Sequence, residues 1–364
     1  MSPADVRKLR LYHQQIAATT CQSPADVVKC LVAMQAQEFR HAKWAIGLRL
    51  QNTTDNVIEK SFNDGAILRT HVMRPTWHFV SPEDIRWLLA LTAPRVHAGN
   101  KPYYKKFELP PALLRRCHNI MSRSLEGGKC LTRNDLQEIL KQNKISAEGP
   151  RLAYIMMHAE LEGLICSGPR IGKQFSYALL EERAPQKKVF THDEALAMFL
   201  LRYFNSRGPA TLHDFTYWSG LTLKEARSGF DSMRNQLQSV KFNSKQYFSG
   251  NLNLPGISNG QDTFLMPDYD EYGMSYKDRS SLAPDVKKKQ SIAQSPSVFN
   301  HYVVVEGAIQ GTWRDEIIKD TIKVLTVFAN PVSLGMKRKI DQALMRYSTF
   351  LGKKLQSATK MKVA

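Results

Sequence analysis

Three stretches of the chain repeat one pattern of apolar and polar positions, and the middle stretch shows it most clearly. Thr132 can cap a helix whose apolar residues follow at helical spacing, and Asp135 supplies the acid of a capping box. A second helix is predicted after Gly149-Pro150. Strand-like runs at 164–166 and 175–177 then enclose a basic turn. Helix, helix and hairpin in this order predict a winged helix, a module that places one helix in a DNA groove.

The first stretch follows the same order over a longer span. A helix is predicted over 6–16, and residues 23–26 form a second capped helix start. The β-rich runs 66–72 and 76–80 flank the turn Met73-Arg74-Pro75, which is a candidate wing. Spacing between corresponding caps differs among the copies, so the pattern indicates a repeated design without a strict sequence repeat. Helix–helix–hairpin order is common in proteins, and one of the three matches can be coincidental.

The third stretch repeats the caps. Thr211 with Asp214, and Thr222 with Glu225, each place an acid three residues after a hydroxyl, as a capping box requires. Residues 241–248 then form the candidate wing of this stretch.

The chain from about residue 262 has a different pattern. Strand-like runs lie at 263–267, 302–305 and 321–328, and the last of these alternates as a half-buried strand does. A helix is predicted over 336–347, followed by a basic tail. Residues 280–299 are rich in Ser, Pro and Lys and are predicted to form a mobile loop.

These patterns predict an α+β fold in which tandem winged-helix domains precede a C-terminal β-rich domain with a terminal helix. The expected limits are 1–105, 106–188 and 189–255 for three winged-helix domains, and 256–364 for the C-terminal domain. The 364 residues suffice for several domains with buried cores.

Composition makes nucleic acid the favoured partner. Lys and Arg number 51 against 33 acidic residues, which gives a net charge of +18, and such an excess promotes association with polyanions. Five scattered cysteines without a C-x-x-C pair support neither a zinc ribbon nor a disulfide framework. A polar start and the lack of a long apolar run predict a soluble cytoplasmic protein that associates with the nucleoid and not with membranes.

Gln35-Ala36-Gln37 is the most informative motif. On a helix, residues two apart point about 200° apart and cannot serve one centre, whereas in an extended segment they point the same way. If both amides face one cavity, the preceding helix must end near Met34. A polar helix surface that carries two glutamines by chance is the competing interpretation.

Other clusters have weaker chemical interpretations. The acidic residues of 268–271 could hold a divalent metal or act as a general base, or they could pair with Arg or Lys to hold the C-terminal domain. His71 and His78 lack a third metal ligand, which favours packing or phosphate contact. Residues 168–173 resemble a phosphate loop only loosely, because three residues separate the glycines and no Ser or Thr follows Lys173.

Gln35-Ala36-Gln37, the run 69–80, and the segments 266–272, 276–279 and 307–313 together make nearly the whole chain resemble the AlkZ and YcaQ type of bacterial DNA glycosylases. The family's catalytic motif is Gln, an apolar residue, then Gln or Asp, and this chain has the Gln-ending version. The resemblance implies a monofunctional glycosylase, tandem winged helices in a C shape with a basic concave channel, and a hairpin that probes the duplex.

The resemblance also implies the chemistry. Alkylation at N7 makes a purine a cationic leaving group, so positioning a water at the sugar carbon suffices without a strong base. We expect Gln37 to position the water and Gln35 to support the water or the sugar, with no metal or organic cofactor. The expected partner is duplex DNA with alkylated purines, including interstrand crosslinks, and the protein is expected to be a monomer.

The expected DNA contacts are basic or histidine side chains near the first two wings. They are Arg69, His71, Arg74, His78, Arg170 and Lys173. The alternative is a non-catalytic winged-helix regulator, which would bind DNA with sequence preference and release no base. An RNA-binding protein ranks last, because Tyr103-Tyr104-Lys105-Lys106-Phe107 is the only aromatic and basic cluster of the kind that it would need.

Overall fold

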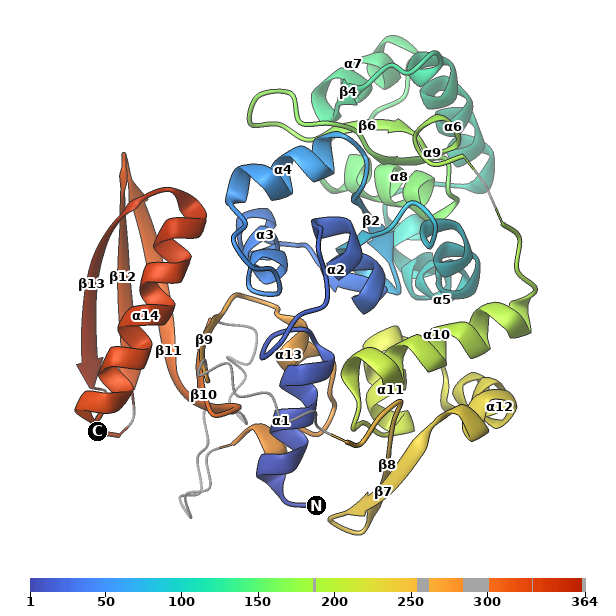
Figure 1. The fold of residues 1–364 in the computed structure, drawn as a ribbon. Coiled ribbons are helices and arrows are strands. Elements are labelled where there is room, and N and C mark those ends of the chain that lie inside the picture. Colours follow the sequence, from blue (N-terminus) through green and yellow to red (C-terminus); the bar gives the residue numbers. More distant parts are fainter. Residues whose placement is uncertain (186–187, 254–261, 284–300, 329, 362–364) are drawn as a thin grey trace.

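The computed structural model describes residues 1–185, 188–253, 262–283, 301–328 and 330–361 (Figure 1). Most of the loop predicted over 280–299 lies outside these residues. The chain folds into three helical units, each with a small sheet, and a C-terminal sheet with a long helix. Within the described residues, no helix combines the length and apolar character needed to cross a membrane.

The first unit contains the glutamine motif and has the order helix, strand, helix, helix, hairpin. Its elements are α2 (Pro24–Leu31), β1 (Ala33–Gln35), α3 (Phe39–Gly47), α4 (Asp55–Asn63), β2 (Leu68–Val72) and β3 (Arg74–Val80). The strands form an antiparallel sheet in the order β1-β3-β2. The predicted hairpin is therefore present, and β1 extends it into a three-stranded sheet.

The second unit has the same order and its own hydrophobic core, built from residues between Leu109 and Leu179. Its elements are α6 (Pro111–Leu125), β4 (Leu131–Thr132), α7 (Arg133–Gln142), α8 (Gly149–Leu161), β5 (Ile165–Ser167) and β6 (Ser176–Leu179), with α5 (Ile85–Lys106) before and α9 (Leu180–Arg183) after them. The predicted capping box is confirmed, because the Asp135 backbone N–H donates to the Thr132 hydroxyl over 3.2 Å.

The third unit repeats the order once more. Its elements are α10 (His192–Arg207), α11 (Leu212–Ser219), α12 (Leu223–Met233), the 3₁₀ turn η1 (Arg234–Gln236), β7 (Gln238–Phe242) and β8 (Lys245–Ser249). A bridge between Ala210 and Phe248 takes the place of the first strand. Both capping boxes predicted in this unit are present.

The C-terminal part is a five-stranded sheet in the order β13-β12-β11-β10-β9. Its elements are β9 (Thr263–Met266), α13 (Glu271–Met274), η2 (Ser280–Leu282), β10 (Tyr302–Val305), β11 (Ala308–Ile318), β12 (Thr321–Phe328), α14 (Leu334–Leu351) and β13 (Lys354–Met361). The three predicted strands are confirmed, and β11 is an additional one. Residues 354–361 of the predicted basic tail form β13, which pairs in parallel with β12 and which their polar sequence does not signal.

The first unit lies between the other parts (Figure 1). It contacts the second unit through β2 and β5, the third through α2 and α10, and the C-terminal helix α14 through α3. One hydrophobic cluster joins the first unit, the third unit and the C-terminal sheet. The domain limits therefore stay a prediction, since the described cores separate only the second unit.

Helix α1 (Pro3–His13), which was expected to open the first unit, packs against α10 and η2. Arg7 Nη1 donates to the Ser281 carbonyl over 3.1 Å, and Arg10 Nε donates to the Pro209 carbonyl over 3.0 Å. These long-range contacts have no local signal in the sequence.

Candidate active site

The glutamine motif is not helical: the chain is extended through Gln35 and bends at Gln37. Helix α2 ends at Leu31, and Val32 adopts a positive φ of 66°, which turns the chain into β1. Gln35 is the last residue of β1 and is 8% exposed. Gln37 is half-buried in the bend before α3. The prediction that the helix ends before the motif is confirmed, and the chance-helix interpretation is wrong.

One face of the β1-β3-β2 sheet carries a row of polar side chains. Gln35 lies directly opposite His78 on β3, and His78 lies opposite Thr70 on β2. Directly opposed residues of antiparallel strands point to the same face, with Cβ atoms about 4.5–5.5 Å apart. Thr76 is two residues before His78 on the same strand and therefore shares this face.

The row has unused hydrogen-bonding capacity. Among the described residues, Gln35 Oε1, Thr70 Oγ1, Thr76 Oγ1 and His78 Nε2 are buried without a hydrogen-bond partner. Unpaired buried polar groups are uncommon in proteins because each costs free energy. A row of four such atoms on one sheet face is typical of a place that receives a polar ligand.

His78 presents an acceptor to this row. Complete burial and the neighbouring Arg74 charge hold the pKa of His78 well below its ordinary value, so the ring is neutral near pH 7. Its Nδ1 lies 3.0 Å from the Thr76 carbonyl oxygen, which can only accept a hydrogen bond. Nδ1 therefore carries the proton, and Nε2 keeps a bare lone pair.

A buried carboxylate fixes the backbone of Gln35 from behind. Glu271 Oε1 accepts from the Gln35 backbone N–H over 3.1 Å. Glu271 Oε2 accepts from Arg207 Nη2 and from Trp218 Nε1, each over 2.8 Å. Burial raises the pKa of Glu271, but the Arg207 charge and these donors outweigh it and lower the pKa overall. Glu271 is therefore ionised and holds the end of β1.

The ion-pairing interpretation of the acidic residues at 268–271 is confirmed for two of them. Besides the Glu271–Arg207 pair, Asp270 accepts two hydrogen bonds from Arg49, over 2.8 and 2.9 Å. Both pairs are buried and connect the C-terminal part to the first and third units. Neither carboxylate is free to act as a general base.

Three of the predicted DNA contacts lie inside the protein. Arg69 and His71 point to the sheet face opposite His78, where Arg69 lies over the Trp77 ring and His71 pairs with Glu160 of α8. Arg69, His71 and His78 are at most 7% exposed. The expectation that Arg69 and His71 contact phosphates is therefore corrected: they join the first unit to the second. His78 belongs to the polar row.

The other three candidates differ in how far they are engaged. Arg170 is half-buried, and its Nη1 lies 3.6 Å from Glu59 Oε1. Lys173 is exposed at the tip of the β5–β6 hairpin. Arg74 is half-buried, and its Nε and Nη2 have no hydrogen-bond partner among the described residues. Arg74 and Lys173 therefore keep the capacity to bind an anion.

Comparison with known proteins shows the family to which this chain belongs. A family model described as DNA glycosylase AlkZ-like matches residues 28–350. The chain belongs to the AlkZ-like DNA glycosylase family. An interstrand DNA cross-link repair glycosylase of Streptomyces sahachiroi is 25% identical over 345 residues, which cover 90% of this chain and 91% of the relative. The prediction of a DNA glycosylase is therefore confirmed, in preference to the non-catalytic regulator.

A solved structure shows the same fold. The Streptomyces sahachiroi DNA glycosylase AlkZ matches with a TM-score of 0.76 and 21% identity, over 98% of this chain and 100% of that chain. The α+β architecture of this AlkZ-like chain is thus shared over its length.

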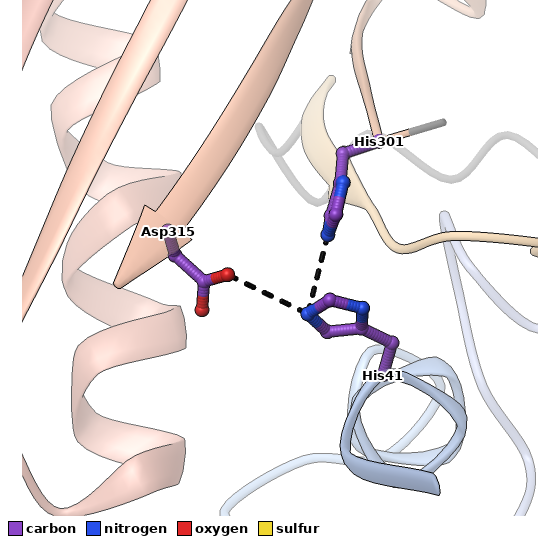
Figure 2. Close-up of side chains that lie close together, drawn as sticks. All are labelled: His41, His301 and Asp315. Carbon is purple, nitrogen blue, oxygen red and sulfur yellow. Dashed lines mark hydrogen bonds and ion pairs between the residues drawn. The ribbon is translucent and has the colours of Figure 1, made fainter. Parts of the chain in front are cut away.

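Two groups of side chains in this AlkZ-like chain could hold a metal ion, and neither was predicted from the sequence. Within the described residues they are His41, His301 and Asp315, drawn in Figure 2, and His97, His158 and Glu162. The members of the first group lie up to 274 positions apart, so no spacing motif announces them. His71 and His78 point to opposite faces of their sheet and cannot share an ion.

Proposed function

We propose that this AlkZ-like glycosylase hydrolyses the N-glycosidic bond of N7-alkylated purines in duplex DNA and unhooks interstrand crosslinks made at N7. The observation that carries the proposal is the buried polar row beside the glutamine motif, whose acceptors have no partner among the described residues. The Streptomyces relative is named as an interstrand DNA cross-link repair glycosylase, which supports the crosslink as substrate.

The reaction needs a positioned water molecule and no strong base. The alkylated purine leaves C1′ with the bonding electron pair and becomes neutral, while the sugar acquires oxocarbenium character. Water attacks C1′, and the new C–O bond makes its proton strongly acidic. Gln37 positions this water, and Gln35 Oε1 accepts one of its hydrogens. The bare Nε2 of His78 lies beside Gln35 and takes the proton that the attacking water releases. His78 is a weak base, but the water bonded to C1′ is a strong acid, so the transfer is favourable.

The same site explains selectivity for damaged bases. An undamaged purine has no positive charge before it leaves, so holding a water does not lower its barrier enough. The ionised Glu271 stabilises the end of β1 and so holds Gln35 in place. No described group beside Gln35 is arranged as a strong acid to protonate a neutral leaving base.

DNA binding is assigned to the three helical units. We infer that each is a winged helix, because each has the order helix, first strand or bridge, helix, helix, hairpin. A basic channel between them would use the net charge of +18. Arg74 and Lys173 are the proposed phosphate contacts, and Arg170 is the third once its pairing with Glu59 is exchanged for DNA.

Three duplexes of identical sequence test the substrate assignment. One carries a single N7-methylguanine, one an N7 interstrand crosslink, and one only undamaged bases. We expect the purified protein to release methylguanine and to unhook the crosslink, and to leave the undamaged duplex intact. Tight binding to all three duplexes without release from either damaged one would contradict the proposal.

A further inference from the structure

His41, His301 and Asp315 converge on one point from three separate elements. His41 lies on α3, His301 immediately before β10, and Asp315 on β11 (Figure 2). The Nε2 atoms of the two histidines are 3.2 Å apart, and His41 Nε2 is 3.5 Å from Asp315 Oδ1. All three ligand atoms lie within 4.8 Å of one another.

These distances fit a tetrahedral metal ion. With metal–nitrogen and metal–oxygen bonds of about 2.0–2.2 Å, neighbouring ligand atoms of a tetrahedral Zn²⁺ site lie about 3.3–3.6 Å apart. Two of the three separations are 3.2 and 3.5 Å, and the third lies within 4.8 Å. Two imidazoles and a carboxylate are also a donor set that Zn²⁺ accepts readily.

A second carboxylate lies beside both imidazoles and is at hydrogen-bond distance from one of them. Asp268 Oδ1 lies 2.9 Å from His301 Nδ1, and Asp268 Oδ2 lies 3.4 Å from His41 Nδ1. When His301 Nδ1 donates to Asp268, His301 Nε2 presents a bare lone pair toward His41 Nε2. A metal ion at this point would replace the hydrogen bond that the two Nε2 atoms otherwise share over 3.2 Å. Tyr347 donates to Asp315 Oδ2 over 2.7 Å, and Arg40 Nη2 donates to Asp315 Oδ1 over 3.0 Å, so a metal ion would share this oxygen with Arg40.

We propose that His41, His301 and Asp315 bind one Zn²⁺ ion, with Asp268 as the carboxylate that orients His301. Three protein ligands leave the fourth position for a water molecule. The ion links α3, which follows the glutamine motif, to the C-terminal sheet, so its role is to fix these parts together. The site does not depend on the proposed substrate, because none of its residues belongs to the polar row of Gln35 and His78.

Metal binding by the full-length protein tests the site directly. The protein is stripped with a chelator, dialysed, and titrated with Zn²⁺ and separately with Co²⁺. We expect one equivalent of tightly bound metal, the visible absorption of tetrahedral Co²⁺, and a rise in Tm on adding Zn²⁺. His301→Gln should abolish all three. His158→Gln, in the second histidine group, is the matched control and should retain them.

A further variant keeps all three ligands in place. Asp268→Asn replaces the carboxylate that orients His301 with a neutral amide, so Zn²⁺ affinity should fall about 10- to 100-fold. Circular dichroism verifies the fold of each variant. The proposal is overturned if the wild-type protein binds no Zn²⁺, which would leave a proton shared by the histidines and Asp268. It is also overturned if binding is lost in His158→Gln but kept in His301→Gln.

Discussion

Glu271 shows how a single buried charge organises the site. Its side chain is 1% exposed, and its oxygens accept hydrogen bonds from the Gln35 backbone, Arg207 and Trp218. Burying a carboxylate is costly, and the guanidinium of Arg207 offsets that cost only while both charges are present. The position of Gln35 therefore depends on an ion pair between the C-terminal part and the third unit.

Glu271→Gln is expected to destabilise the protein strongly. The amide removes the negative charge, leaves Arg207 buried without a counter-ion, and turns an NH₂ group toward one of the present donors. Breaking a buried pair in this way costs about 3–5 kcal/mol. Urea unfolding measures the loss, with the exposed Glu316→Gln as a control expected within about 0.5 kcal/mol of wild type. Equal stability of the two variants would contradict the assigned role.

The neutral His78 gives stability a pH dependence of known sign. Burial and the charge of Arg74 hold the pKa of His78 in the folded protein well below 6.5. Below pH 6.5 the unfolded chain therefore binds a proton at this histidine that the folded protein does not bind. The contribution of the neutral His78 to the free energy of unfolding is fully present above pH 6.5. It is lost as pH falls toward the folded pKa, by up to about 1.4 kcal/mol per pH unit. Unfolding free energies at pH 7.5 and 5.0 should differ more for wild type than for His78→Gln. A larger difference in the variant would show that His78 is charged.

At the scale of elements, the helix caps could be predicted from the sequence, whereas the packing of one element against another could not. The capping boxes at Thr132, Thr211 and Thr222 were correctly predicted because both partners lie within four residues. The two faces of the β1-β3-β2 sheet follow from a period of two, but sequence alone did not reveal which face would be covered. Arg69 and His71 were misassigned for this reason, since they lie on the face that packs against the second unit.

Gly220 fixes how the third unit approaches the glutamine sheet. It ends α11 with a φ of +76°, and a Cβ there would lie 2.7 Å from the Met73 carbonyl oxygen in the β2–β3 turn. Gly220→Ala should therefore combine backbone strain with a clash, destabilise by more than about 1 kcal/mol, and slow base release. Gly172→Ala is the matched control, because its φ is +60° and nothing lies within 4 Å of its Cβ.

Chemical denaturation and release kinetics of both glycine variants separate the two effects. Strain alone affects Gly172→Ala, so the additional loss in Gly220→Ala measures the contact with Met73. Equal losses in both variants would mean that the turn does not depend on the third unit.

At the scale of the whole molecule, the first unit is held by the parts that surround it. Buried ion pairs connect Arg49 to Asp270 and Arg207 to Glu271, and helix α1 ties the third unit to residues near 281. These contacts join positions 64 to 274 residues apart. No periodicity or spacing encodes these contacts. The units and the glutamine motif could be predicted from the sequence. The role of Glu271 in holding Gln35, and the group of His41, His301 and Asp315, could not.

The central claim is that the glutamine motif and its polar row carry out base release. Single-turnover release of N7-methylguanine, with protein in excess over a saturated duplex, tests it most directly in Gln35→Ala and Gln37→Ala. The exposed Gln51→Ala is the matched control. The account predicts rates lower by about 100-fold or more in the two motif variants, with unchanged DNA affinity and wild-type rates in the control. Wild-type release by both motif variants would contradict it.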